Sequence, residues 1–202
     1  MTTTVAIGNS ALIKLGETQV MSFSDSSKAA KLLNTRFDMV RDSLLRSYNW
    51  SFAKARASLA SSATAPDFGY LYQFDFLPEM LRVTRIGDYY VGLNLSDYNS
   101  TDSSYYKIEG RAILSNEPGP LRVTYIKRIE DPSLFDPSFT EAFACRLAYD
   151  LAESLTDSAS KKQAAKEEFG AAIREAIRAN AIELDPEIVA DDSWVLSRVT
   201  NG

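Results

Sequence analysis

The residue types that most often perform catalysis are scarce in this sequence. None of its 202 residues is a histidine, so the usual base of a nucleophilic triad, the commonest zinc ligand and the side chain that titrates near neutral pH are all missing. Cys145 is the single cysteine, which excludes an intramolecular disulfide. We expect its side chain to be small, half-buried and unreactive, because no histidine is available to activate it.

Acidic pairs and glycines give no clearer sign of a catalytic or ligand site. Glu167 and Glu168 are neighbours, as are Asp191 and Asp192, and adjacent side chains on a helix point about 100° apart, too far to share a proton or a metal. We interpret these acids as solvated. The glycines match neither the Walker nor the dinucleotide-binding spacing. The sequence therefore predicts no catalytic residue, no metal, no cofactor and no enzyme activity.

A basic segment with aromatic residues, from Lys28 to Arg56, has two interpretations. Basic side chains mixed with aromatic rings suit phosphate contact and base stacking. The other interpretation, which we favour, is an amphipathic helix with Trp50 and Phe52 in the core and with ion pairs along its surface. We expect these pairs to be Asp38 with Arg41 and Asp42 with Arg46.

Tyrosines concentrate farther along the chain, between residues 70 and 106. Exposed tyrosines and tryptophans are enriched at interfaces because they supply large contact areas with few rotatable bonds. Together with the arginines of the basic segment, they define the candidate interface residues: Arg36, Arg41, Arg46, Trp50, Tyr70, Tyr72, Tyr89, Tyr90, Tyr105, Tyr106 and Trp194.

Charge is distributed unevenly along the chain. Residues 1–129 contain fifteen Lys and Arg against twelve Asp and Glu, whereas residues 130–202 contain seven against fifteen, which together give the net charge of −5. An acidic protein is poorly suited to gripping nucleic acid, because that affinity comes from neutralising phosphates, but DNA can slide past it. No stretch approaches the roughly 18 apolar residues of a membrane span, and no signal peptide is evident. We expect no membrane partner.

The first part of the chain has helical periodicity. A short helix is expected around Leu12 and should end at Gly16, where a left-handed cap is sterically free. Apolar residues at spacings of three and four then predict a helix to about Tyr48, with Ser24 or Asp25 as its N-cap. A second short helical stretch is expected over 51–59. These elements form a predicted N-terminal helical part, residues 1–65.

Residues 66–130 have the period-two alternation of strands. Five or six short strands with turns between them predict a small antiparallel β-sandwich or barrel. Helical periodicity returns after Asp136-Pro137, a start signal with proline in the first turn. Residues 131–181 are predicted to form a helical hairpin, with a turn at 156–158, that packs on the N-terminal helices. An extended acidic tail, 182–202, follows. The fold class predicted is α+β, a helical bundle built from both chain ends with the β subdomain inserted.

Several short strings follow one another in a fixed order between Ala11 and Arg82. They are ALIKLG at 11–16, SD at 24–25, KAA at 28–30, FD at 37–38, VRD at 40–42, LR at 45–46, WSFA at 50–53, RASLA at 56–60, FGY at 68–70, Tyr72, LP at 77–78 and LR at 81–82. This order resembles the opening of the head-to-tail adaptor, or tail tubular A, proteins of short-tailed bacteriophages. Residues 83–202 are similar to that family only in general character.

The resemblance implies a virion structural protein, made in the host cytoplasm and located at the head–tail interface. It would be a gatekeeper subunit of a ring, dodecameric in this family, between the portal protein and the tail nozzle, with tail fibres as a further partner and genomic DNA passing through the lumen. Two alternatives stay open: a nucleic-acid-binding module that uses residues 28–56, and a tail-associated enzyme that degrades the cell wall. The latter would need a buried carboxylate with a raised pKa.

Overall fold

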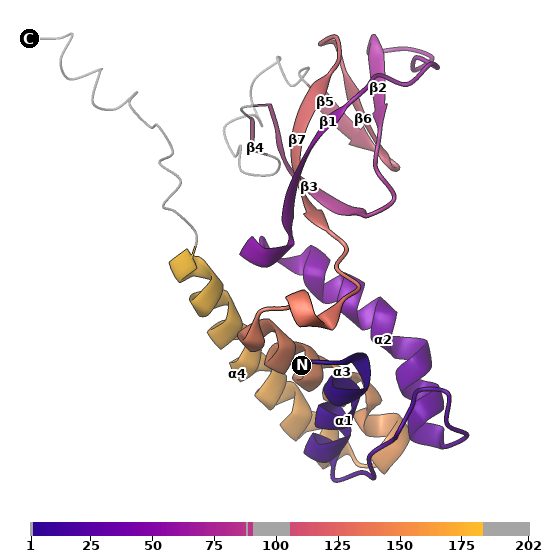
Figure 1. The fold of residues 1–202 in the computed structure, drawn as a ribbon, viewed down its shortest axis with the longest axis vertical. Helices are drawn as coiled ribbons and strands as arrows, with labels where there is room; N and C mark the ends of the chain where they lie inside the picture. Colours follow the sequence, from indigo (N-terminus) through magenta and orange to yellow (C-terminus); the bar gives the residue numbers. More distant parts are fainter. Residues whose placement is uncertain (1, 88, 91–105, 184–202) are drawn as a thin grey trace, which may run out of the picture.

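The computed structural model describes residues 2–87, 89–90 and 106–183. In this part of the chain the fold is mixed, with four α-helices at one end of the molecule and small antiparallel sheets at the other (Figure 1). The helices come from both ends of the chain and the strands from its middle. This order agrees with the predicted α+β class.

The first two helices begin and end at residues with identifiable caps. Helix α1, Thr4–Leu15, starts where the Thr3 side chain accepts a hydrogen bond from the Ala6 amide, and ends at Gly16, whose φ of 71° is left-handed as predicted. Helix α2, Lys28–Ser47, has Ser27 as its N-cap. The prediction of Ser24 or Asp25 was wrong, because the Asp25 carboxylate accepts hydrogen bonds from the Met21 and Ser22 amides instead and closes the preceding loop.

The helix expected over 51–59 is not formed. A single 3-10 turn, η1, covers Ser51–Ala53, and strand β1 covers Lys54–Leu59. This strand pairs antiparallel with β7, Leu121–Lys127, from Lys54↔Ile126 to Leu59↔Leu121. Pairing with a strand more than sixty residues away outweighs the weak local preference for helix. The β part of the molecule therefore begins at residue 54, within the segment predicted as helical.

Two separate sheets make up the β part, so the closed barrel that we considered is not formed by the described residues. The order in the larger sheet is β1-β7-β3-β4, with β3 at Met80–Ile86 and β4 at Tyr89–Tyr90. The smaller sheet has the order β2-β6-β5, with β2 at Tyr72–Asp75, β5 at Tyr106–Glu109 and β6 at Ala112–Ser115. The sheets share one apolar core, which contains Leu59, Phe74, Val83, Ile113 and Tyr125.

The last two helices are placed as the sequence predicted. A 3-10 turn, η3, at Pro132–Leu134 leads to α3, Pro137–Thr156, which Asp136 caps by accepting hydrogen bonds from two amides of the first turn. Asp157 adopts a left-handed conformation, φ 48°, and ends α3. Helix α4, Ala159–Glu183, follows and runs two residues beyond 181, the predicted end of the helical hairpin. Residues 182–183 of the predicted tail are thus helical, and the rest of that tail lies outside the described residues.

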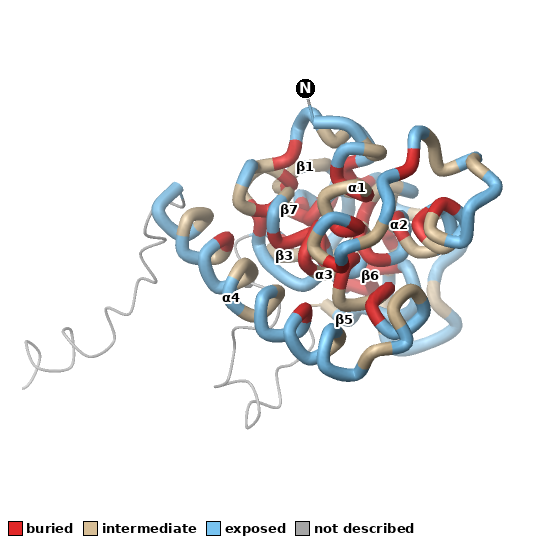
Figure 2. Tube along the Cα trace, turned by 90° about the horizontal axis from the view of Figure 1, so that it is seen from below, coloured by how far each residue is buried: buried red, intermediate tan, exposed pale blue. Residues whose placement is uncertain are grey.

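Helix α4 packs on the other helices by a narrow strip of its surface. Its buried residues are Ala165 and Ala176, and Phe169, Ile173 and Ile177 are half-buried against the helical core. Most of its remaining surface is exposed (Figure 2). No described helix is both long and apolar enough to cross a bilayer.

Candidate interaction surfaces

Arg36, a candidate interface residue on α2, is partly exposed and pairs with a carboxylate of α3. Its guanidinium donates two hydrogen bonds to Asp150, Nε to Oδ2 at 2.6 Å and the terminal NH2 to Oδ1 at 3.0 Å. The hydrogen bonds and the charge of that carboxylate raise the pKa of Arg36. This bidentate pair joins the two helices, which is a structural use of the guanidinium.

Arg41 is buried and belongs to a second network. It pairs with Asp38 at 2.9 Å, as predicted, and also with Asp42 at 2.9 Å. Asp42 in turn accepts a hydrogen bond from Arg128, 2.8 Å away in the segment after β7. The predicted pair of Asp42 with Arg46 was therefore wrong, and Arg46 donates instead to a backbone carbonyl in β3. The network joins α2 to the β part.

Trp50 is also removed from the candidate interface, because its side chain lies in the helical core. It is 1% exposed, and its indole N–H donates to the Leu44 carbonyl at 3.0 Å. Its ring contacts those of Phe139, 5.0 Å away, and Phe52. The core position that we favoured for Trp50 is confirmed. A nucleic-acid surface over residues 28–56 consequently lacks Trp50 and Arg41, which are buried, and Arg36, which is ion-paired.

The tyrosines do not form one exposed cluster in the described residues. Tyr72 and Tyr106 are half-buried and pack part of their side chains against the core between the sheets. Tyr70 is half-buried at the end of the loop before β2. The backbones of Tyr89 and Tyr90 form β4, whose side chains lie outside the described part. Two further candidates also lie outside it, Tyr105 and Trp194.

A cluster that the sequence did not predict joins α1, α3 and α4. The ammonium of Lys14 lies 2.7 Å from Glu141 and 2.5 Å from Glu168, and the thiol of Cys145 is 3.8 Å from the Glu141 carboxylate. Burial opposes the charge of Lys14, but the hydrogen bonds to both carboxylates outweigh it and raise the pKa. These acids and the thiol are close enough to hold a metal. Since the ammonium already supplies the cation, we interpret the cluster as an ion pair that joins three helices.

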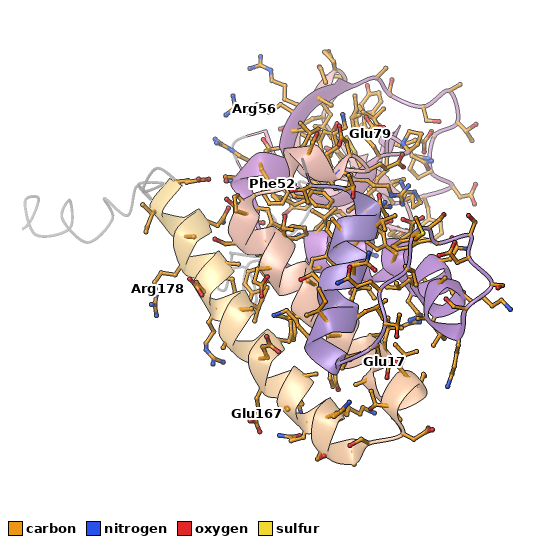
Figure 3. All side chains as sticks on the ribbon, turned by 60° about the horizontal axis from the view of Figure 1, so that its bottom comes forward. Glu17, Phe52, Arg56, Glu79, Glu167 and Arg178 are labelled. Carbon is orange, nitrogen blue, oxygen red and sulfur yellow. The ribbon has the colours of Figure 1, made fainter. Side chains whose placement is uncertain are left out.

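The cluster corrects the burial expected for Cys145 and supports its expected lack of reactivity. Glu168 pairs with Lys14 but is exposed as predicted, and so is its neighbour Glu167, which points away from α4 (Figure 3). Cys145 is fully buried, at 1% exposure, where we expected a half-buried side chain. Desolvation raises the pKa of its thiol to about 11. The protonated form is a poor nucleophile.

We therefore expect Cys145 to be inert toward thiol reagents in the folded protein. Only a minute fraction is thiolate at pH 7.5, and the buried sulfur is shielded from a bulky disulfide reagent. Mixing with such a reagent should give no rapid absorbance change, and one equivalent should react after unfolding in guanidinium chloride. Stoichiometric labelling of the folded protein within seconds would contradict this assignment.

Basic side chains gather on the outer face of the larger sheet. Residues that alternate with the core positions of β1, β3 and β7 point to this side, and the register aligns Arg56 with Thr124 and Thr124 with Arg85 across the three strands. Figure 3 shows Arg56 pointing away from the body of the molecule. We call this surface the basic face and define it by Lys54, Arg56, Arg82, Arg85 and Arg122. The sequence did not reveal it because 54–59 was predicted as helix.

Large apolar side chains are exposed at both ends of the molecule. At the β end, Phe68 is 87% exposed and Leu71 66% exposed on the loop between β1 and β2. At the helical end, Met21 is 93% exposed on the loop between α1 and α2. Figure 1 places these two loops at opposite ends of the long axis. Phenylalanine and methionine are enriched at protein interfaces relative to the rest of the surface.

Comparison with known proteins does not assign the chain. No protein-family model matches the sequence, and no curated protein matches it.

Proposed function

We propose that this protein is a structural subunit of a bacteriophage head-to-tail adaptor ring of the tail tubular A type. It would connect the portal protein to the tail nozzle in the virion and line or gate the DNA channel. The proposal starts from the order of sequence strings between residues 11 and 82. In this proposal a helical bundle from both chain ends and a sandwich of the two sheets form the two ends of each subunit.

The observation that carries the proposal furthest is the position of the exposed apolar side chains. Phe68 and Leu71 at the β end and Met21 at the helical end offer an anchor at each end of one elongated subunit. An adaptor must contact two different neighbours along one axis, which fits this arrangement. Each subunit must also contact the next through two different surfaces, since head-to-tail contacts close into rings.

The charge distribution supplies a second argument. The basic face belongs to β1, β3 and β7, whereas residues 130–202 have eight more acidic than basic residues. This uneven distribution favours contacts between copies in which oppositely charged parts meet, because complementary charges attract and like charges repel. Such a contact requires no catalytic group.

The substitution Phe68→Asp tests the apolar anchor of the β end. Truncating an anchor at the centre of an interface costs about 2 kcal/mol or more, roughly thirtyfold in affinity, and a buried charge adds to this loss. We expect the variant to fold normally but to lose assembly with itself or with the portal protein encoded in the same genome, as measured by multi-angle light scattering. Met39→Asp is the matched control, because Met39 is 59% exposed on α2 and lies at neither end. Equal assembly by both variants would contradict the role of Phe68.

A further inference from the structure

We propose that the basic face is a docking site for the acidic C-terminal segment of the same chain, residues 184–202. The inference goes beyond the proposed function and does not depend on ring formation. It rests on the charge of the face, on the position where α4 ends, and on the composition and length of the segment that follows.

Like charges are concentrated on the basic face. Arg56 and Arg85 flank Thr124 on opposite sides, and Arg122 pairs with Ser58 one step farther along β1. None of the outward positions on the described strands β1, β3 and β7 is acidic. Arg56 and Arg85 lie on β1 and β3 with β7 between them, so each of the three strands presents positive charge on this face, which attracts a segment of opposite charge.

Arg82 forms the edge of the basic face that lies nearest to α2. Arg82 lies on β3 opposite Ile126, and its pKa is lowered by burial and by the nearby charge of Arg46 on α2. Its guanidinium donates to Asn49, a neutral partner that cancels no charge. An acidic segment over this face would supply negative charge at this edge.

The segment that follows α4 has the complementary charge. Residues 184–202 contain four acids against Arg198 as the single basic residue, and the acids all precede residue 193: Asp185, Glu187, Asp191 and Asp192. They lie within the first nine residues after α4. The part of the segment nearest to α4 in the sequence is therefore the most acidic.

The end of α4 lies beside the start of the basic face. Ser51, three residues before β1, donates its amide to the Asn180 side chain at 2.7 Å and its hydroxyl to the Glu183 carboxylate at 2.7 Å. The chain therefore leaves α4 next to Ser51, three residues before Lys54. Eleven extended residues, 184–194, span about 36 Å, whereas the six residues of β1 span about 20 Å. The acids can reach every cation of the face, and Trp194 can reach Ser58.

Because residues 184–202 are attached to the same chain, they are favoured on the basic face over a ligand that is free in solution. A short tether of this kind gives an effective concentration in the millimolar range, so weak ion pairs suffice for docking. A nucleic acid would match the same charges, but it would have to displace the segment. The two occupants can be separated by experiment.

Contact quenching by Trp194 tests the proposal in the full-length chain. Ser58→Cys places a bimane label on the exposed outward side of β1, between Arg56 and Arg122, and Cys145→Ala removes the buried native thiol. We expect the bimane emission to be well below that of the same labelled protein carrying Trp194→Phe. Trp50 is present in both proteins and therefore affects their emission equally. Raising the salt from about 0.1 to about 1 M shortens the Debye length from about 10 to about 3 Å and should restore the emission.

Neutral variants identify the charges responsible. Neutralising the segment with Asp185→Asn, Glu187→Gln, Asp191→Asn and Asp192→Asn should raise the emission to the level of the Trp194→Phe protein. The control variant, Glu167→Gln with Glu175→Gln, neutralises exposed acids on α4 and should leave the quenching unchanged.

Three outcomes would overturn the proposal. Equal emission from the labelled protein with Trp194 and from its Trp194→Phe variant would show that the segment does not reach the face. Quenching that increases with protein concentration would assign the face to the segment of another copy. Unquenched label whose emission responds to a DNA duplex at low salt would assign the face to nucleic acid. Quenching that is independent of dilution supports docking within one chain.

Discussion

Replacing Phe139 by alanine is expected to lower the free energy of unfolding by about 3–5 kcal/mol, the usual cost of truncating a buried phenylalanine. The side chain is fully buried, and its ring lies 5.0 Å from Trp50, 5.0 Å from Phe52 and 5.2 Å from Phe135. These rings come from α3, from the turn before it and from the segment around η1. Because the cluster joins the two ends of the chain, the cavity cannot be filled by moving one helix alone.

Guanidinium unfolding followed by circular dichroism measures this loss. Phe68→Ala is the matched control, since it makes the same chemical change at a side chain that is 87% exposed. Exposed substitutions usually change stability by less than about 0.5 kcal/mol. A cost for Phe139→Ala no greater than for Phe68→Ala would contradict the position assigned to the aromatic cluster.

The substitution Asp42→Asn is expected to cost about 2 kcal/mol, because it leaves the buried guanidinium of Arg41 without its better-shielded carboxylate. The Arg41 side chain is 8% exposed and that of Asp42 is 25% exposed. Asp42 also holds Arg128 at 2.8 Å. Removing one charge therefore weakens two ion pairs, one within α2 and one that joins α2 to the chain leaving β7.

Asp38 provides the control for this prediction. It contacts the same guanidinium at 2.9 Å, but its side chain is 76% exposed. Exposed ion pairs contribute little, about 0.2–1 kcal/mol, so Asp38→Asn should cost clearly less than Asp42→Asn in the same unfolding measurement. Equal losses would show that solvent screens both carboxylates alike, contrary to the burial of Arg41.

Elements with strong local signals were predictable from the sequence. Gly16 ends α1, and Asp136 with Pro137 starts α3, because caps act through the adjacent amides alone. The stripe of Phe139, Phe143 and Leu147 identifies the buried side of α3. Local chemistry is sufficient in each of these cases.

Strand β1 was not predictable in the same way, because its formation depends on distant pairing. Ala55, Ala57 and Leu59 do alternate with Lys54, Arg56 and Ser58, but alanine is a strong helix former and the run directly follows a helix. Pairing with β7 decides the conformation. The basic face depends on the same pairing, so it was missed together with the strand.

The candidate interface was predicted less well than the fold, because residue type does not fix exposure. Trp50 and Arg41 have the side chains typical of binding surfaces, yet both are buried. Phe68, the most exposed aromatic residue of the described chain, lies in a loop with no periodicity to show which way it points. Whether each of these side chains is buried or exposed depends on tertiary packing.

Electron microscopy of the purified full-length protein, alone and mixed with the portal protein encoded in the same genome, tests the central claim most directly. The account predicts closed rings of this protein, or a ring of its copies bound at one end of the portal, with the dodecameric count of the adaptor family as the expected number. Single, unassociated molecules in both samples at micromolar concentration would contradict it.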